Sequence, residues 1–235
     1  MYSFSKIGVG IVTCNRKDSY KRLFEKVQQN SEIDVIVTVK NKEFDYEDCD
    51  PTKQVSRDEN QIYKSFNVKE DLGVGYCKNL CLKELLKEDC KHLFLIEDDI
   101  DIKRDDVFRK YIATAGIFNL HHLNFCMAWD SITKKYLTPS YSVAHPSGFS
   151  LSIFDRLCGD FEYFTSDVIL QAGLFDAKHY INALEHAEHT YRIASLGLTT
   201  PFYAFADIYH SNEYLEDTGI ESSIHHDAAS QQLYQ

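Results

Sequence analysis

Strand-like and helix-like segments alternate at the start of this chain, and that alternation leaves few folds open to it. Residues 6–14, KIGVGIVTC, and residues 33–41, IDVIVTVKN, read as buried strands because both are rich in Ile and Val. Between them, residues 15–30 repeat apolar side chains at i, i+3, i+4 and i+7, the spacing of an amphipathic helix. This order of elements predicts the beginning of a parallel sheet.

The same alternation continues beyond the second strand. Residues 61–68 read as a third strand, residues 71–88 contain two early glycines and continue as a helix, and residues 92–97 form a fourth apolar run. The polar stretch 44–60 contains Pro51 and reads as loop. The sequence therefore predicts an α/β fold, a mostly parallel sheet flanked by helices, in which ligands bind beyond the carboxyl ends of the strands.

The second half of the chain has a mixed pattern, which predicts a smaller subregion of helices and short strands. Helices are expected over 104–118 and 185–198, and strands over 123–129, 141–145 and 148–154. We find no internal repeat and no linker, so we expect a single domain over 1–235. Its halves, 1–103 and 104–210, are followed by a polar tail, 211–235, that we expect to be mobile.

The composition argues against several classes of protein. Hydrophobic residues make up 44% and aromatic residues 13% of the chain, yet no apolar run approaches the roughly 20 residues of a membrane helix. The N-terminus lacks a signal-peptide pattern and the seven Cys show no CxxC pair, so we expect a cytoplasmic protein with reduced thiols. A net charge of −11 disfavours broad binding to nucleic acid phosphates.

The fourth apolar run ends in a group of carboxylates. Within HLFLIEDDIDI, residues 92–102, four acidic side chains lie close together: Glu97, Asp98, Asp99 and Asp101. Like charges repel, and burying them without a partner is costly. Carboxylate oxygens suit a hard cation, Mn²⁺ or Mg²⁺, and few are needed if a substrate diphosphate supplies other ligands. The alternative is a solvated acidic turn that caps the following helix.

Three stretches follow one another in a recognisable order: IGVGIVTCNR at 7–16, DLGVGYCKNLCL at 71–82 and FLIEDDIDI at 94–102. Together they resemble the nucleotide-binding first strand, the next helix start and the metal-binding acidic motif of GT-A glycosyltransferases, family 2 in particular. The order and spacing agree over residues 6–103. The resemblance implies a Rossmann-like GT-A fold and the transfer of a sugar from a nucleotide.

The resemblance also implies roles at matching positions. It implies contacts to a nucleotide sugar, expected to be UDP-linked, from Thr13, Asn15, Arg16, Asn41, Lys78 and Asp98. It implies that Asp99 binds the metal. Ordinary alternatives exist: Thr13 as a strand residue, Arg16 as a solvated cation at a helix start, and Lys78 as a residue without a ligand role.

Downstream, QAGLFDAKHYINALEHAEHTYRI at 171–193 has the layout of the acidic motif that supplies the general base in family 2. The motif is written G-E-D-x-[DE], and residues 184–188 depart from it: Leu184 stands for the Gly and His186 for the Asp that is usually the base. Either His186 or Glu185 is then the base. An unperturbed histidine pKa near ~6.5 suits proton abstraction at neutral pH.

His210 follows the predicted strand FADIY, residues 205–209. Many GT-A enzymes carry a His after the last core strand as a second protein ligand of the metal, so the resemblance implies that His210 joins Asp99. A lone His is more often structural, which is the alternative.

We therefore expect a metal-dependent glycosyltransferase that moves a sugar from a nucleotide diphosphate to an acceptor hydroxyl, with inversion; the altered motif leaves retention open. Residues 1–103 would bind the donor and 104–210 the acceptor: a glycan, protein or small molecule, with nucleic acid disfavoured. One alternative is a nucleotidyltransferase, against which the Gly-free stretch TCNRKDSY counts. Another is a non-catalytic module that binds sugar nucleotides or glycans, supported only by His186.

Overall fold

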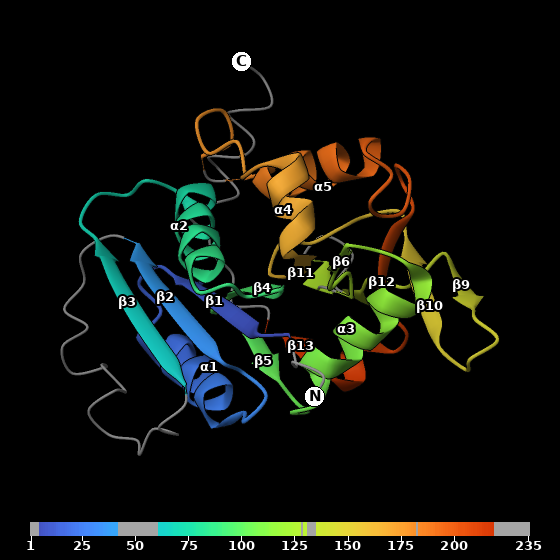
Figure 1. The fold of residues 1–235 in the computed structure, drawn as a ribbon, viewed down its shortest axis with the longest axis horizontal. Coiled ribbons are helices and arrows are strands. Elements are labelled where there is room, and N and C mark those ends of the chain that lie inside the picture. Colours follow the sequence, from blue (N-terminus) through green and yellow to red (C-terminus); the bar gives the residue numbers. More distant parts are fainter. Residues whose placement is uncertain (1–4, 42–60, 128, 131–134, 182, 219–235) are drawn as a thin grey trace.

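The computed structural model describes residues 5–41, 61–127, 129–130, 135–181 and 183–218. Six strands form the central sheet, in the order β3-β2-β1-β4-β11-β6 (Figure 1). Their bounds, in that order, are Ile62–Val68, Val35–Asn41, Ile7–Thr13, His92–Glu97, Phe161–Thr165 and His122–Asn124. The first four strands are mutually parallel, so the predicted mostly parallel sheet is confirmed.

Strand β11 is the strand of the central sheet that the sequence analysis missed. It lies between β4 and β6 and runs antiparallel to both. Phe161 pairs with Ile96 near the end of β4, so Asp160, the residue before β11, lies at the carboxyl edge of the parallel strands. The strand expected over 123–129 is shorter in the structure, because β6 ends at Asn124.

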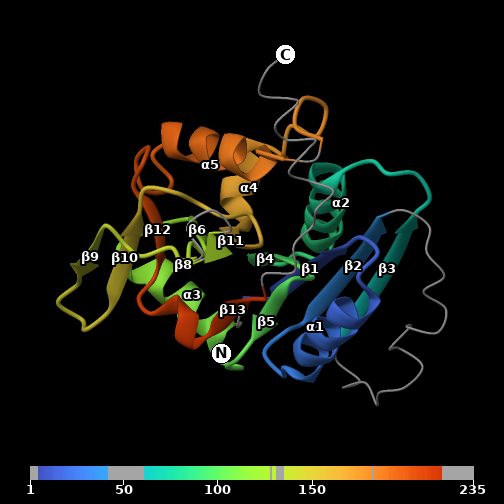
Figure 2. The ribbon, with the colours of Figure 1, turned by 180° about the vertical axis from the view of Figure 1, so that it is seen from behind.

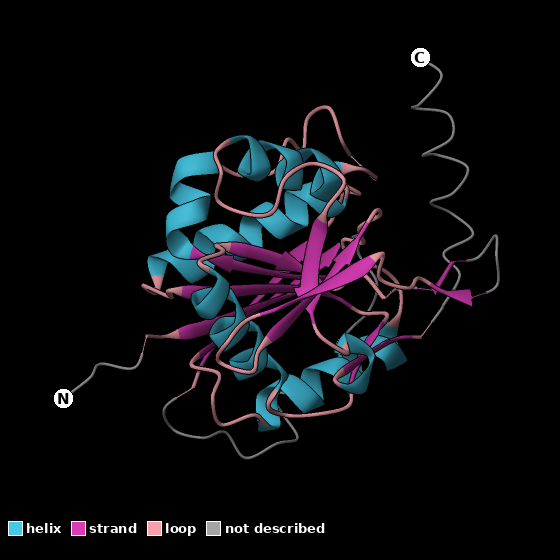
Figure 3. Cartoon of the chain, turned by 90° about the vertical axis from the view of Figure 1, so that its right-hand side faces the viewer, coloured by secondary structure: helices cyan, strands magenta, loops and turns pink. Residues whose placement is uncertain are grey.

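Helices cover both faces of the sheet. On one face lie α2 (Val74–Lys87), α4 (Ser166–Ala172) and α5 (Glu185–Ser195), and on the other α1 (Lys17–Gln29) and α3 (Val107–Phe118) (Figures 1 and 2). Figure 3 shows the strands lying between these helical layers, and each face has its own hydrophobic core. In the part of the chain that the structure describes, none of these helices has the length and apolar character to cross a bilayer.

The mixed subregion is built on a second, antiparallel sheet in the order β12-β10-β9. These strands span Phe205–Ile208, Ser150–Phe154 and Tyr141–Ala144. Two short pairs complete the strands: β5 (Ile100–Ile102) with β13 (Leu215–Asp217), and β7 (Trp129–Asp130) with β8 (Lys135–Tyr136). Because β5 directly follows Glu97, Asp98 and Asp99, its pairing with β13 places residues 215–217 beside the acidic motif.

The tail from residue 211, which we expected to be mobile, begins with regular structure. Ser211–Glu213 forms a 3₁₀ helix, η3, ahead of β13. Asp207 anchors this segment, because its buried carboxylate accepts hydrogen bonds from the hydroxyls of Tyr111 and Ser211, both at 2.6 Å. Residues 219–235 lie outside the described part of the chain.

Two glycines in β1 let α2 approach the sheet closely. A Cβ added to Gly10 would lie 2.6 Å from the Cβ of Cys81 and 2.9 Å from Cδ2 of Leu95. A Cβ added to Gly8 would lie 2.6 Å from Cδ2 of Leu85. Side chains alternate along a strand, so the two glycines share the face that α2 covers.

We expect Gly10→Ala to lower the free energy of unfolding by about 1–3 kcal/mol, because the added methyl group overpacks this contact. The control is Gly116→Ala in α3, where an added Cβ meets nothing within 4 Å. There the same change should raise stability by about 0.5–1 kcal/mol, since Ala favours a helix. Urea unfolding followed by circular dichroism measures both; equal effects would contradict the packing argument.

Candidate functional site

Three carboxylates from separate elements meet at the carboxyl edge of the parallel strands. Glu97 ends β4, Asp99 lies in the turn before β5, and Asp160 precedes β11. The backbone N–H of Glu97 donates to the carbonyl of Asp160 at 2.8 Å, which ties the two strand ends together. Sequence reasoning missed Asp160, because only the antiparallel course of β11 brings it to this edge.

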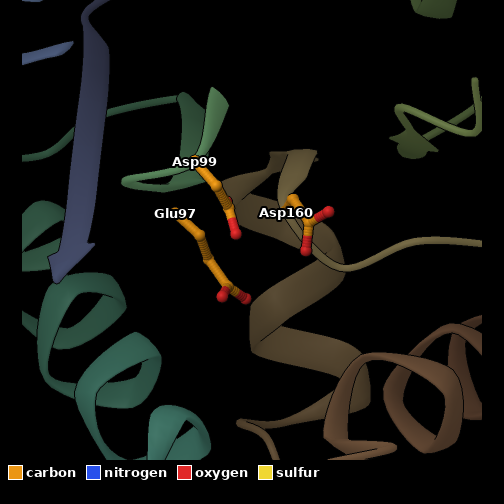
Figure 4. Close-up of side chains that lie close together, drawn as sticks. All are labelled: Glu97, Asp99 and Asp160. Atoms are coloured by element: carbon orange, nitrogen blue, oxygen red, sulfur yellow. The ribbon is translucent and has the colours of Figure 1, made fainter. Parts of the chain in front are cut away.

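The carboxylates of this acidic cluster, Glu97, Asp99 and Asp160, face a common space (Figure 4). One oxygen from each lies within 4.8 Å of the others. Burial and the charge of Glu97 raise the pKa of Asp99, and burial with the charges of Asp99 and Glu97 raises that of Asp160. The buried Oδ1 of Asp99 accepts no hydrogen bond from the described residues. Mutual repulsion and an unsatisfied oxygen together make this cluster a candidate site for a cation.

This acidic cluster fits a hard divalent cation. Mn²⁺ and Mg²⁺ prefer oxygen ligands, and both leave positions for a substrate phosphate when the protein supplies only a few. Asp99, implied as a metal ligand by the sequence, lies in the group that could hold the ion. Glu97 and Asp160 are its neighbours there.

His210 lies apart from this acidic cluster. It is exposed, has a positive φ of 55° at the start of η3, and packs its ring against Tyr209 at 3.9 Å. Within the described ranges, the residues grouped closely enough to hold a metal do not include it. The segment that reaches the site comes later: Thr218 donates backbone and hydroxyl hydrogen bonds to the carbonyl of Asp99, at 2.9 and 2.8 Å.

Asp98 contacts Thr13 at the end of β1 and Arg16, and it does not belong to the acidic cluster. Its carboxylate accepts a hydrogen bond from the hydroxyl of Thr13 at 2.5 Å. Arg16 pairs with Asp98 at 3.2 Å and with Asp99 at 2.9 Å. Burial raises the pKa of Asp98 to about 7, although Arg16 and Thr13 oppose that rise. The structure thus brings Thr13, Arg16 and Asp98 together.

A cavity of about 490 Å³ opens beside these residues, where β1 passes into α1; its lining is Asn15, Arg16, Lys17, Asp18 and Ser19. Asn41, at the end of β2, is buried and holds the loop before α2. Its amide donates to Asp71 at 2.9 Å and accepts from the backbone N–H of Leu72 at 3.3 Å. Asn15 and Arg16 therefore line this cavity, and the amide of Asn41 is bound to the loop before α2.

Lys78 lies at the centre of the site with no exposed surface. Its ammonium contacts four oxygens, those of Gly159 (carbonyl, 2.8 Å), Glu97 (2.9 Å), Glu185 (3.0 Å) and Glu162 (3.2 Å). Burial alone would lower the pKa of Lys78, but the three carboxylates raise it well above its usual value. The structure thus directs Lys78 toward β4, β11 and α5 and not toward an open surface.

Glu185 and His186 begin α5 and differ in their surroundings. Glu185 is buried, and burial would raise its pKa; the charge of Lys78 and a hydrogen bond from His186 outweigh that and lower the pKa of Glu185. A carboxylate held so firmly in its charged form is a weak base. The Nδ1 of His186 lies 3.4 Å from Glu185, and the ring is partly exposed. A Cβ added to Gly159 would lie 2.6 Å from that ring, so glycine makes room for it.

No protein-family model matches the sequence, and a search of curated proteins finds no relative. Solved structures do resemble it. The mannosyltransferase PcManGT from Pyrobaculum calidifontis, solved with GDP-Man and Mn²⁺, has a TM-score of 0.63 and 12% identity over 100% of this chain and 63% of its own. GalNAc-T7, solved with UDP, GalNAc and Mn²⁺, has a TM-score of 0.63 and 11% identity over 88% of this chain and 43% of its own.

A nucleotidyltransferase also has a similar structure: 4-diphosphocytidyl-2C-methyl-D-erythritol synthase from Anaerococcus prevotii. Its TM-score is 0.51 at 12% identity, over 98% of this chain and 96% of its own. The chain spans 43–63% of the length of the two glycosyltransferases. The structural similarity to these two glycosyltransferases confirms the predicted GT-A fold.

We expect Lys78→Met to lower the free energy of unfolding by about 3–5 kcal/mol, because it leaves two buried carboxylates, Glu162 and Glu185, and the partly exposed Glu97 without their shared cation. The control is Lys64→Met. Lys64 pairs with Glu84 at 3.0 Å and Glu88 at 2.6 Å near the surface, so its loss should cost about 1 kcal/mol or less. Urea unfolding compares the two variants. A loss for Lys78→Met no larger than for Lys64→Met would contradict the central role of the buried ammonium.

Proposed function

We propose that this protein is a metal-dependent glycosyltransferase that transfers a sugar from a nucleoside diphosphate, in particular UDP, to an acceptor hydroxyl. The observation that carries the proposal is the acidic cluster at the carboxyl edge of a GT-A sheet, beside the cavity at the start of α1. Ligands of such sheets bind at this edge. The Mn²⁺ and nucleotides bound by PcManGT and GalNAc-T7 support the choice.

In this proposal the donor lies between the cavity and the acidic cluster. Asn15 and Arg16 contact the nucleotide, and Asp98, held by Thr13, faces the ribose. Glu97, Asp99 and Asp160 hold Mn²⁺ or Mg²⁺, which when bound neutralises charge on the departing diphosphate. The two other implied donor residues act through the protein: Asn41 holds the loop before α2, and Lys78 holds the carboxylates in place.

His186 is the general base in this proposal, and Glu185 is a positioning residue. Glu185 holds Nδ1 of the imidazole, which leaves Nε2 free to take the proton of the acceptor hydroxyl. The acceptor oxygen then forms a bond to the anomeric carbon while the bond from that carbon to the diphosphate breaks. The nucleoside diphosphate leaves with the electron pair. A single displacement of this kind inverts the anomeric centre, and the acceptor is a glycan, a protein or a small molecule.

A nucleotidyltransferase is the second candidate, because the synthase from Anaerococcus prevotii matches nearly the whole chain and is itself matched over 96% of its length. That reaction joins a nucleotide to a phosphate and releases pyrophosphate. Incubation with CTP or UTP and a sugar phosphate, followed by a pyrophosphate assay, distinguishes it. Pyrophosphate release without any use of nucleotide sugars would favour this candidate over the glycosyltransferase.

We expect UDP to bind more tightly with Mn²⁺ than with EDTA in calorimetric titrations. Asp160→Asn should reduce the Mn²⁺-dependent gain by about tenfold or more, equivalent to about 1.4 kcal/mol. The control is Asp101→Asn, since Asp101 is an acidic neighbour that pairs with Arg22 at 3.6 Å outside the acidic cluster. Identical UDP affinity with Mn²⁺ and with EDTA in the wild-type protein would refute the metal site.

We expect His186→Asn to lower turnover by about 10²–10⁴-fold, because a positioned base typically contributes that much. Donor affinity should stay nearly unchanged, since the base acts in the transition state. The readout is UDP release from the nucleotide sugar that most stabilises the protein. His179→Asn is the control: His179 is exposed and bound to Asp176 at 2.7 Å, in the loop before α5. Turnover equal to wild type in His186→Asn would rule out this base.

A further inference from the structure

Leu184 holds a strained backbone conformation beside the proposed base. Its φ of 67° and ψ of 0° lie in the left-handed region, directly before Glu185 and His186. Glycine adopts this conformation freely, whereas a residue with a Cβ is strained in it. Glycine also fills this position in the motif that residues 184–188 resemble. Strain of this kind directly before a proposed base makes Leu184 a candidate for a functional role.

Leu184 is one of three exposed apolar residues that come from two segments packed against each other, the start of α2 and the chain before α5. Its surface is 38% exposed, that of Ile181 is 39% and that of Tyr76 is 42%. A Cβ on Gly73 would lie 2.1 Å from the carbonyl oxygen and 2.7 Å from Cγ2 of Ile181, so the segment before α5 lies across the start of α2, where Tyr76 is found. We call Tyr76, Ile181 and Leu184 the apolar rim.

Hydrogen bonds join α2 to the chain on either side of Ile181 and Leu184. Asn79 donates to the carbonyl of Phe175 at 2.9 Å and accepts from its backbone N–H at 2.8 Å. At the other end, Lys78 donates to Glu185 at 3.0 Å. The rim therefore offers a surface that exists before any ligand binds, which favours affinity.

We propose that the apolar rim binds the acceptor, and that the acceptor carries an alkyl or aromatic group next to the hydroxyl that receives the sugar. The proposal rests on the proposed function. Leu184 directly precedes Glu185 and His186, so an acceptor whose hydroxyl contacts the imidazole of His186 would bind close to Leu184. An apolar group next to that hydroxyl would then cover the apolar rim and shield it from water. Binding strengthens with the apolar area buried. A plain polyol gains nothing there.

The variant that tests this is Leu184→Gly, which removes the side chain and relieves the backbone strain. We expect its melting temperature to rise by about 2–4 °C. Tyr203→Gly is the matched control. Tyr203 also has a positive φ, of 60°, and is 74% exposed, but it lies beyond the far end of α5. It should gain stability in the same way without any change in acceptor binding.

Benzyl alcohol serves as the acceptor probe and glycerol as the polyol reference, each added to protein loaded with UDP and Mn²⁺. The paramagnetic broadening of the probe's NMR signals by Mn²⁺, relative to Mg²⁺, reports binding near the acidic cluster. We expect broadening of benzyl alcohol to exceed that of glycerol, to fall about fivefold or more in Leu184→Gly, and to persist in Tyr203→Gly.

Broadening that is unchanged in Leu184→Gly, or as strong for glycerol as for benzyl alcohol, overturns the inference. The same samples separate this failure from failure of the proposed function. Mn²⁺-dependent UDP binding is measured in each by calorimetry. If the wild-type protein binds UDP with Mn²⁺ but the broadening of benzyl alcohol does not depend on Leu184, only the proposed acceptor class is wrong. If UDP and Mn²⁺ do not bind together, both proposals fall.

Discussion

A buried ammonium, that of Lys78, holds three carboxylates together where β4, β11 and α5 meet. One positive charge does not balance three negative ones, and burial raises the pKa of Glu162 to about 7 although Lys78 lowers it. The positions of Glu97 and Glu185 depend on this contact. Glu97 belongs to the acidic cluster and Glu185 contacts His186. The two halves of the site, the acidic cluster and the pair of Glu185 and His186, are therefore both positioned by the side chain of Lys78.

The turn before β11 joins those halves as well. The carbonyl of Gly159 accepts a hydrogen bond from Lys78, the residue packs closely against His186, and the next residue is Asp160. A shift of this turn would move a carboxylate of the acidic cluster and the imidazole together. These two groups are therefore linked through one turn, by the packing of Gly159 against His186 and by the peptide bond from Gly159 to Asp160.

The sequence predicted what local patterns determine. The apolar runs of β1, β2 and β4 and the acidic end of β4 can be recognised without knowledge of the fold. Asp160 could not be found, because its place depends on an antiparallel strand inserted between β4 and β6. The different surroundings of Glu185 and His186 were equally out of reach, since they depend on the burial of Glu185 against Lys78. His210 was assigned from its position after a strand, and the structure carries the chain to Asp99 only at Thr218.

Arg16 gives the site a resident counter-ion. Its guanidinium lies 2.9 Å from Asp99, so a free divalent cation that reaches this carboxylate must compete with a charge already in place. A cation that arrives with a diphosphate brings anionic oxygens, which a guanidinium binds well. Arg16 can then exchange Asp99 for an oxygen of the diphosphate while the cation takes its place at Asp99. Each charged group keeps a partner of opposite charge in this exchange. In the proposed site, an arginine in this position would therefore favour a cation that arrives with a nucleotide over a free divalent cation.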